Sequence, residues 1–281
     1  MSNNLKWVFF GTGDVSVSVL NDLEKEGLLP SLVVTTPDKP QGRKLVITPS
    51  PVKIWALEKN IEILQPEKID GTFINSLKKE PWELFIVVAY GKIIPKEVLE
   101  IPTHKSLNIH YSLLPRLRGS SPVEGAILQD ERETGVSIIL MDEKMDHGPI
   151  LAQEKVETPA WPPTRTELMN IMNDVAGKLL ATVIPKWIKG EIEAIPQDHS
   201  KATFVKMINK EDGLVDLADE PYTNYKKIMA YERWPRAYFM DKGRRVIINK
   251  ASWNDGNLKI EKVTPESKKE MSYEDYLGRI V

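Results

Sequence analysis

Residues 84–89 are apolar at every position, and this run constrains the fold more than any other segment of the chain. Its sequence, Leu-Phe-Ile-Val-Val-Ala, has the length of a strand and is far shorter than a membrane span, which takes about 18 residues or more. A strand that is apolar on both faces must be covered on both sides. This is typical of a central strand in a parallel sheet with helices on each face. The run therefore predicts an α/β protein.

Other short apolar runs alternate with helix-like segments through the first two thirds of the chain. Strands are expected at 6–10, 31–35, 62–64, 106–110 and 136–141, and helices at 15–23, 122–129 and 164–188. This alternation predicts a doubly wound, Rossmann-like and mostly parallel sheet.

The last third has a different pattern. Residues 189–201 are polar and interrupted by glycine and proline, which favours a linker. Beyond them, a helix near 222–232 precedes short strands separated by Asp-Lys-Gly and Asn-Asp-Gly turns, which is typical of hairpins. We therefore predict a large α/β domain over 1–189, a linker over 190–203 and a small, mostly β domain over 204–281.

The composition excludes several classes of protein. Of the 281 residues, 41% are apolar and 28% are charged, as in an ordinary globular enzyme, which argues against disorder. Cysteine is absent and the four histidines include no i, i+4 pair, so neither disulfides nor a metal site is expected. Without a membrane span or a signal peptide, we expect a cytoplasmic protein. The net charge of −2 confines any nucleic-acid contact to local patches.

A Gly-Thr-Gly sequence at 11–13 follows the first expected strand and raises the question of a dinucleotide site. That motif needs a third glycine at position 16, where this chain has Ser16, and an acidic residue after the second strand, where Thr35 and Thr36 stand. The sequence therefore favours a tight strand-to-helix turn over NAD(P) binding.

Polar side chains cluster where two expected strands end. Asn108 and His110 are two residues apart on one strand, so they project from the same face, and Asp142 and Asp146 follow a later strand. An amide beside an imidazole suits stabilisation of an oxyanion and proton handling in acyl transfer, with a carboxylate to orient the imidazole. A half-buried histidine, a capping asparagine and loop aspartates would explain the same residues without chemistry.

A long connection, residues 37–53, follows the second strand. It holds four prolines and the basic residues Lys39, Arg43, Lys44 and Lys53. Long loops of this kind are often functional, and the basic side chains suit contact with phosphates. A solvated loop is the alternative interpretation.

Together these segments resemble the methionyl-tRNA formyltransferase family, over about residues 5–240. The motifs that carry the resemblance are Phe10-Gly-Thr12, Pro37-Asp-Lys-Pro-Gln-Gly-Arg43, Pro49-Ser-Pro-Val-Lys53, Val87-Val-Ala-Tyr-Gly91, Asn108-Ile-His110, Ser112-Leu-Leu-Pro-Arg116, Arg118-Gly119, Glu133-Thr-Gly135, Met141-Asp142 and Asp146. One difference is that Leu45-Val-Ile-Thr48 stand where the family often has lysines.

The resemblance implies a function and a set of site residues. The chain would transfer the formyl group of 10-formyltetrahydrofolate to the α-amine of methionyl-initiator tRNA, as a monomer without a metal. Residues 1–189 would be the catalytic domain with the formyltransferase fold, and 204–281 an OB-like barrel of the tRNA-binding type. The catalytic residues would be Asn108, His110 and Asp146. The folate site would consist of Val87, Val88, Ala89, Tyr90, Gly91, Ser112, Leu113, Leu114, Pro115, Arg116 and Asp142. The tRNA contacts would be Lys39, Arg43, Lys44, Lys242, Arg244 and Arg245.

Three other functions remain open at this point. Formyl transfer to a nucleotide-linked amino sugar would use a related architecture, although a small acceptor gives no reason for the insertion at 37–53. Hydrolysis of the same folate would replace the amine with water. A non-catalytic RNA-binding or folate-sensing protein would keep the fold, but has no need of Asn108, His110 and Asp146 together.

Overall fold

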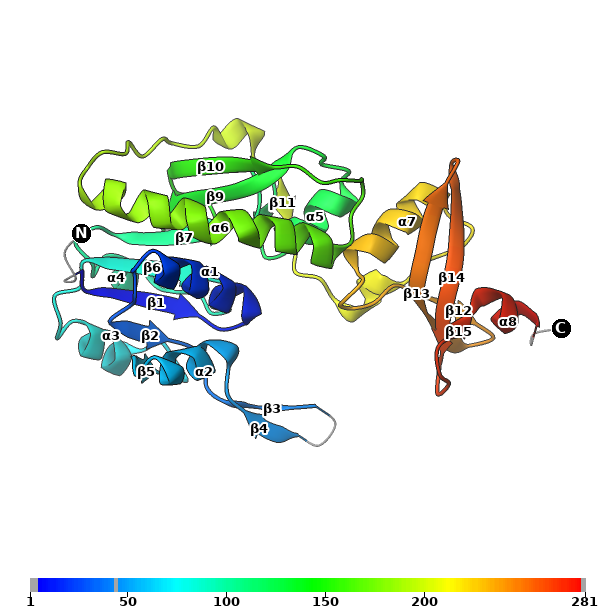
Figure 1. Ribbon diagram of the computed structural model, residues 1–281, viewed down its shortest axis with the longest axis horizontal. Coiled ribbons are helices and arrows are strands. Elements are labelled where there is room, and N and C mark those ends of the chain that lie inside the picture. The colour runs from blue at the N-terminus through cyan, green and yellow to red at the C-terminus, as the bar shows by residue number, and fades with distance from the viewer. Residues whose placement is uncertain (1–4, 43–44, 279–281) are drawn as a thin grey trace. The chain divides into compact units, whose positions relative to one another are not determined.

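A seven-stranded sheet organises the first part of the molecule, in the computed structural model that describes residues 5–42 and 45–278 (Figure 1). The strand order is β10-β9-β7-β6-β1-β2-β5. The bounds of its strands are β1 (Trp7–Gly11), β2 (Leu32–Val34), β5 (Glu62–Leu64), β6 (Leu84–Val88), β7 (Ser106–His110), β9 (Thr134–Leu140) and β10 (Ile150–Val156). Strands β5, β2, β1, β6 and β7 are parallel, and β9 runs antiparallel to β7. The predicted mostly parallel α/β sheet is thereby confirmed.

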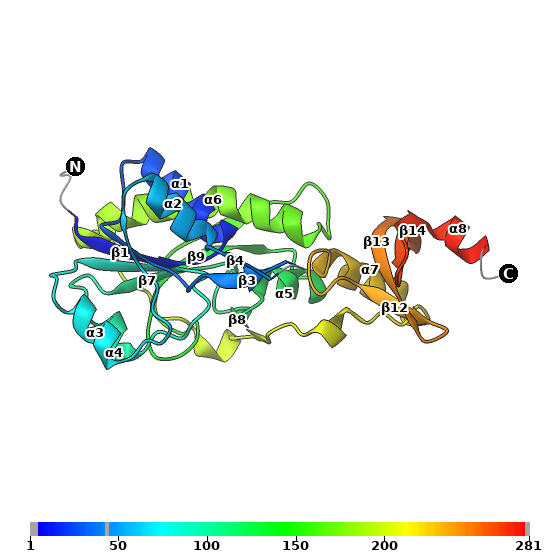
Figure 2. The ribbon, with the colours of Figure 1, turned by 90° about the horizontal axis from the view of Figure 1, so that it is seen from below.

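Helices cover both faces of this sheet. They are α1 (Asp14–Lys25), α2 (Pro51–Glu58), α3 (Gly71–Leu77), α4 (Lys96–Leu99) and the long α6 (Arg165–Ile188). Figure 2 shows α1, α2 and α6 on one face and α3 and α4 on the other. Strand β6 lies between β1 and β7, and each of its residues is buried, as its unbroken apolar sequence requires.

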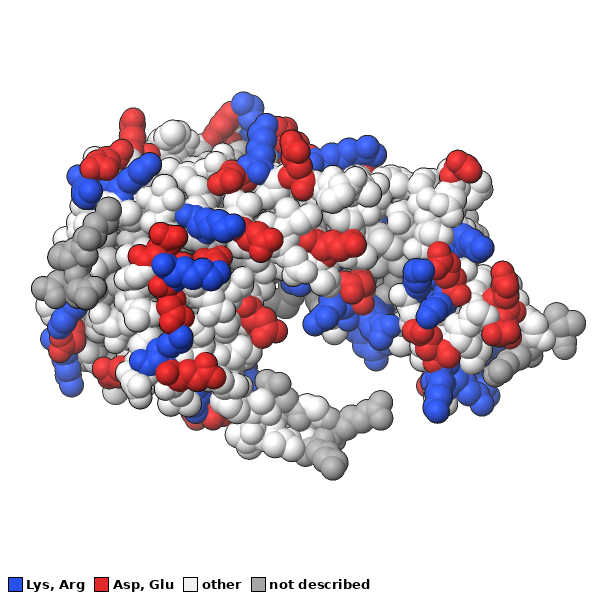
Figure 3. Space-filling view, viewed as in Figure 1, with Lys and Arg blue, Asp and Glu red and all other residues white. Residues whose placement is uncertain are grey.

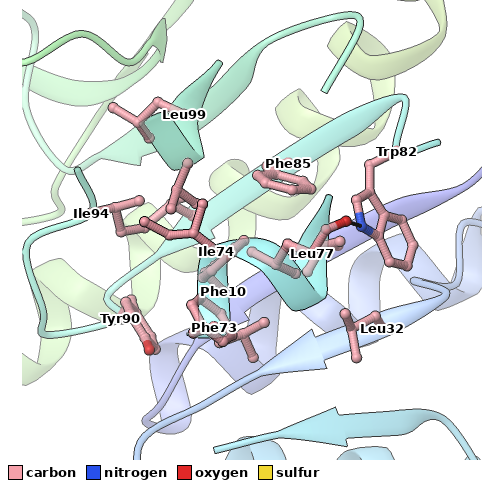
Figure 4. Packing of buried hydrophobic residues seen from close by; sticks show 14 residues of the cluster. Phe10, Leu32, Phe73, Ile74, Leu77, Trp82, Phe85, Tyr90, Ile94 and Leu99 are labelled. Atoms are coloured by element: carbon pink, nitrogen blue, oxygen red, sulfur yellow. Dashed lines mark hydrogen bonds between the residues drawn. The ribbon is translucent and has the colours of Figure 1, made fainter. Parts of the chain in front are cut away.

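An aromatic cluster fills the space between the sheet and helices α3 and α4 (Figure 4). The ring of Phe10 lies 5.3 Å from that of Phe85 and 5.6 Å from that of Tyr90, centroid to centroid. Trp82 packs in the same cluster and donates a hydrogen bond of 2.8 Å from Nε1 to the carbonyl of Leu77. This packing fixes the carboxyl ends of β1 and β6 on a rigid base.

The Gly-Thr-Gly turn after β1 packs tightly against its own helix. A Cβ on Gly11 would come within 2.8 Å of Ser16, so only glycine fits there. The Ser16 hydroxyl accepts a hydrogen bond from the Thr12 amide and donates one of 2.7 Å to the carbonyl of Val88. Ser16 thus ties the turn to β6 at the position where a dinucleotide motif has its third glycine.

The connection at 37–53, expected to be a loop, contains a β-hairpin instead. Strands β3 (Lys39–Gln41) and β4 (Val46–Thr48) pair antiparallel, and the paired positions include Pro40 opposite Ile47. Three consecutive apolar residues are open to solvent here, with 70% of Leu45, 59% of Val46 and 63% of Ile47 exposed. In Figure 3 the described part of this hairpin accordingly shows mainly uncharged side chains, drawn in white.

The chain divides into two compact units. The first comprises Met1–Arg118, Gly135–Lys155 and Met172–Ala202, and the second comprises Gly119–Thr134, Val156–Ile171 and Thr203–Val281. The second unit contains an antiparallel sheet in the order β12-β13-β14-β15, which confirms a smaller, mostly β part. Its elements are α5 (Pro122–Leu128), β11 (Phe204–Val205), α7 (Pro221–Ala230), β12 (Tyr238–Asp241), β13 (Arg244–Asn254), β14 (Asn257–Pro265), β15 (Met271–Ser272) and α8 (Tyr273–Gly278). Closure of this sheet into a barrel stays a prediction.

The segment expected to be a linker, 190–203, packs with the first unit through Ala202. Ile195 exchanges two backbone hydrogen bonds with Ile150 of β10, at 2.8 and 2.9 Å. A single 3₁₀ turn, His199–Lys201, follows. In the part of the chain that the structure describes, no helix is both long and apolar enough to cross a membrane.

Candidate active site

The candidate catalytic residues come together at the carboxyl end of β7. Asn108 is half-buried, and His110, the last residue of the strand, is 5% exposed. This edge of the sheet also carries the ends of β1 and β6, from which the chain winds in opposite directions to β2 and to β7. Open α/β sheets bind their ligands at such a point. The topology therefore places Asn108 and His110 where a ligand is expected.

Both ring nitrogens of His110 face an acceptor. Nε2 lies 2.9 Å from the carbonyl oxygen of Leu117, and because a carbonyl only accepts, this nitrogen must carry a hydrogen. Nδ1 lies 3.4 Å from Oδ1 of Asp146, whose side chain is 13% exposed. A hydrogen on Nδ1 would point to this carboxylate, so Asp146 can orient the imidazole.

The loop that carries Asp146 is tightly constrained. Asp146 has a φ of 52°, in the left-handed region that non-glycine residues seldom adopt. Two residues on, Gly148 lies so close to the end of β9 that a Cβ would come within 1.9 Å of the carbonyl oxygen of Leu140. The loop can pass β9 only with glycine at that position.

Two buried polar residues that the sequence did not single out lie behind this loop. Gln197 is 6% exposed and donates from Nε2 to the carbonyls of Asp146 and Gly148, at 2.9 and 2.7 Å. Arg118 is 4% exposed and donates to Oε1 of Gln197 from Nε and Nη2, at 3.1 and 2.6 Å. Gln197 stands in the polar segment predicted as a linker, and nothing in its local sequence distinguishes it. Arg118 was part of a family motif but had no assigned role.

Asp142 has a different environment from Asp146. Its carboxylate lies 2.6 Å from Nδ1 of His147 and accepts a hydrogen bond from the Lys144 amide. The His147 ring stacks on that of His199, with centroids 4.1 Å apart. Loss of hydration where its ring meets its neighbours lowers the pKa of the otherwise exposed His199, and the nearby His147 and Arg118 lower it further. Nδ1 of His199 lies 2.9 Å from Nη2 of Arg118 and must therefore be the acceptor.

The candidate folate residues at 87–91 divide by exposure. The side chains of Val87, Val88 and Tyr90 are buried, and burial raises the pKa of Tyr90 to about 12. Ala89 and Gly91 are exposed and have φ values of 45° and 81°. A ligand at this strand end can therefore meet mainly backbone, because the larger side chains are committed to the core.

The second candidate folate segment, residues 112–116, is fastened to β9 and β10. The Ser137 hydroxyl of β9 donates to the carbonyl of Ser112 and accepts from the amide of Leu114. Gln153 of β10 donates from Nε2 to the carbonyl of Leu114 and to the Ser137 hydroxyl. The Ser112 hydroxyl donates to the carbonyl of Arg116. Leu114 is buried, whereas Leu113, Pro115 and Arg116 are partly exposed.

The candidate tRNA residues are divided between the two compact units. Lys39 is exposed on the hairpin, and Arg43 and Lys44 lie outside the described residues. In the second unit, Lys242 and Arg244 are exposed and line a cavity of about 440 Å³. Arg245 is turned to the protein: its guanidinium lies 3.9 Å from the Tyr238 ring centroid and donates to the carbonyl of Pro235. On the face shown in Figure 3, acidic and basic side chains are interspersed.

No cluster of three or more His, Asp and Glu side chains capable of holding a metal ion occurs within 5–42 and 45–278.

Solved structures with the same architecture include two that bear on the fold. A methionyl-tRNA formyltransferase from Clostridium thermocellum superposes with a TM-score of 0.62 at 19% identity, covering 93% of this chain and 99% of that one. An N-formyltransferase from Helicobacter canadensis, in complex with folinic acid and dTDP-3-aminofucose, gives 0.65 at 15% identity, covering 96% and 99%. At these identities the likeness establishes the fold.

Sequence comparison goes further. The model of the formyl transferase family matches residues 5–184. A methionyl-tRNA formyltransferase from Chloroflexus aurantiacus is 43% identical over 250 residues, which cover 88% of this chain and 80% of that protein. Another, from Halalkalibacterium halodurans, is 42% identical over 242 residues, covering 85% and 76%. The chain that places Asn108, His110 and Asp146 at the end of β7 therefore belongs to the formyl transferase family, in its methionyl-tRNA formyltransferase branch.

Proposed function

We propose that this protein transfers the formyl group of 10-formyltetrahydrofolate to the α-amine of methionyl-initiator tRNA and so supplies formylmethionyl-tRNA for translation initiation. The observation that carries the proposal is the meeting of Asn108, His110 and Asp146 at one strand end, in a chain 43% identical to a protein of that name. Translation initiation implies a cytoplasmic protein, and we propose that it acts as a monomer without a metal.

The reaction forms a bond between the methionyl nitrogen and the formyl carbon and breaks the bond between that carbon and N10 of the folate. The amine loses a proton, and N10 gains one. Negative charge develops on the formyl oxygen between these two events, so the residues of the site act on that oxygen and on the protons.

Asn108 supplies an amide N–H to the formyl oxygen. A donor aimed at developing charge in a site shielded from water is worth about 10²–10³ in rate. His110 projects from the same face of β7, with Nε2 on the carbonyl of Leu117 and Nδ1 toward Asp146. When protonated, its ring would therefore stabilise the oxyanion through its positive charge, while Asn108 supplies the hydrogen bond.

Asp146 orients His110 and helps to relay the proton of the attacking amine. Its carboxylate lies 3.4 Å from Nδ1, longer than a strong hydrogen bond, and such contacts commonly tighten when substrate binds. Asp142 is paired with His147 and is therefore assigned to the folate site rather than to proton transfer.

The folate would lie against backbone at Ala89 and Gly91 and against the segment 112–116. The exposure of the small residues beyond β6 supports this placement, because a planar, amide-rich ring system needs accessible backbone donors and acceptors. Space is open beside Gly91, where an added Cβ would meet no atom within 4 Å. Val87, Val88 and Tyr90 would act only through their backbone.

The tRNA would be held by exposed basic residues of both units. Lys242 and Arg244 are the two candidates free to meet phosphates in the second unit, whereas Arg245 supports Tyr238. Lys39 would contact the tRNA from the hairpin. Arg43 and Lys44 are proposed as tRNA contacts from the sequence alone.

The test is formylation of methionyl-initiator tRNA by the purified protein with 10-formyltetrahydrofolate, followed by separation of formylated product. Formylation that is lost in His110→Ala and kept in His104→Ala would support the proposal, because His104 lies just before the opposite end of β7. If no tRNA is formylated while a nucleotide-linked amino sugar is, the acceptor in this proposal is wrong. Release of formate without any acceptor would indicate a hydrolase.

A further inference from the structure

We propose that Gln197 is a positioning residue for formyl transfer: it holds the Asp146 loop in register with His110, and Arg118 holds Gln197. This inference rests on the proposed function of the site. It concerns a residue outside the family motifs, in a segment whose sequence predicts a linker.

The orientation of the Gln197 amide follows from the chemistry of its neighbours. Arg118 can only donate, so Oε1 must face it, and the carbonyls of Asp146 and Gly148 can only accept, so Nε2 must face them. The amide therefore makes four hydrogen bonds, two on each side, with all of its donors and acceptors used. Among uncharged side chains, only an amide of this length meets both sides.

Arg118 and Gln197 together connect to both hydrogen-bonding neighbours of His110. Asp146, which faces Nδ1, is held through its carbonyl by Gln197. Leu117, whose carbonyl binds Nε2, directly precedes Arg118 in the chain. The imidazole thus lies between two groups that one buried arginine–glutamine pair connects.

Both of these groups have a backbone conformation that needs support. Asp146 and Leu117 have φ values of 52° and 59°, which non-glycine residues adopt only where their surroundings hold them. For Asp146 the surroundings are the close approach of Gly148 to β9 on one side and the Gln197 amide on the other. Without the amide, the carbonyls of Asp146 and Gly148 lose the hydrogen bonds to Gln197, and the loop is free to move away from His110.

Two substitutions separate positioning from mere structural support. Gln197→Glu keeps the size of the side chain and the Arg118 pair but loses both donors and directs an oxygen at two carbonyls. Gln197→Met loses the hydrogen bonds to Arg118 and those to the two carbonyls, and it adds no charge.

If Gln197 positions the Asp146 loop, both variants should lower kcat by about 10- to 100-fold, because small misplacements of reacting groups have effects of that order. The KM values for tRNA and folate change by less than about 3-fold. If Gln197 serves only to satisfy Arg118, the Glu variant keeps the wild-type kcat, and the proposal is overturned.

Gln153→Glu is the matched control. Gln153 also donates to a backbone carbonyl, that of Leu114, but in the candidate folate segment. Its variant is expected to raise the KM for folate while kcat changes little. All variants are assayed at a temperature where circular dichroism shows the native fold, and if the Glu variant does not fold, the Met variant decides.

A second readout does not depend on activity. The chain has four histidines, so the ring ¹⁵N signals of His110 can be assigned with single substitutions. In Gln197→Glu or Gln197→Met, we expect the Nδ1 signal of His110 to shift, while the signals of His104 stay in place. An unchanged His110 spectrum would contradict the inference even if kcat falls. If the wild-type protein does not formylate tRNA, the proposed function fails, and the spectrum still tests whether Gln197 holds Asp146 against His110.

Discussion

At the end of β7, His110 is 5% exposed and each of its ring nitrogens faces a partner, whereas Val46 and Ile47 in hairpin β3–β4 are 59% and 63% exposed. In the first region each hydrogen-bond partner matters, because a buried polar group that loses its partner has no water molecule to replace it. The second region presents side chains that solvent already surrounds. Single substitutions near His110 should therefore lower the activity strongly, whereas substitutions in the hairpin should change it little. The first kind should act on kcat, and changes at exposed residues should act on the KM for tRNA.

The largest effect is expected for Asp146→Asn. The variant keeps the shape of the side chain but cannot accept the amine proton, so kcat should fall by about 10²–10⁴-fold, while the melting temperature stays near that of the wild type. Steady-state formylation and thermal unfolding measure the two quantities. Asp142→Asn is the control on the same loop, and it should act on the KM for folate instead. An Asp146→Asn protein with more than a tenth of the normal rate would remove Asp146 from the mechanism.

Asn108→Ala comes next. Loss of one donor to the formyl oxygen should lower kcat by about 10²–10³-fold with little change in either KM, because the hydrogen bond strengthens only as charge develops. Single-turnover kinetics with saturating substrates measure the chemical step directly. A change confined to the KM for folate would mean that Asn108 binds the donor and does not stabilise the oxyanion.

Combined Lys242→Ala and Arg244→Ala substitution tests the exposed side of the comparison. We expect the KM for tRNA to rise by about 10-fold with kcat unchanged, since exposed phosphate contacts contribute to binding through counterion release. Measured between 50 and about 200 mM salt, the dependence of this KM on salt should be weaker in the variant than in the wild type. Arg245→Lys serves as the contrasting change, because it should lower stability through the Tyr238 contact.

A smaller effect is expected for the hairpin. Val46→Ser with Ile47→Ser should leave the melting temperature and kcat unchanged, since both side chains are already in solvent, and change the KM for tRNA by less than about 3-fold. Equal loss of kcat in this variant and in Asn108→Ala would break the distinction between the two regions.

The smallest effect is the titration of His199, an exposed residue that contacts the buried Arg118. Its pKa is lowered, so it stays neutral to a lower pH than a histidine in the unfolded chain, whose pKa is about 6.5. The unfolded state then binds more protons in mildly acidic solution, and the stability of the protein decreases as the pH falls through that range. NMR titration should give His199 a lower midpoint than an unfolded peptide of the same sequence.

Much of the fold could be predicted because its signals are local. The uniform burial of β6 follows from an unbroken apolar run, and the placement of Asn108 and His110 on one strand follows from a spacing of two. The hairpin could not be predicted in the same way, because β3 contains Pro40 and each strand has only three residues. The second unit also recruits α5 and residues 156–171, which adjoin it only through tertiary packing.

The residues of the candidate site also differ in whether a local sequence signal identifies them. Asn108, His110 and Asp146 could be named from motifs, but Gln197 and Arg118 are separated by 79 positions and meet only in the folded chain. A buried glutamine in a polar segment has no local pattern, because its partners are two backbone carbonyls and an arginine that all lie far from it in the sequence.

The packing of residues 190–202 on the first unit determines where a truncated protein can end. A shortened protein that stops after Lys189, where the sequence alone suggests a border, would lack Gln197 and the strand-like pairing of Ile195 with Ile150. It would retain every residue of the recognised motifs up to Asp146, but the carbonyls of Asp146 and Gly148 and the buried Arg118 would lose their hydrogen bonds to Gln197. The first compact unit continues through Ala202, so a shortened protein should extend at least that far.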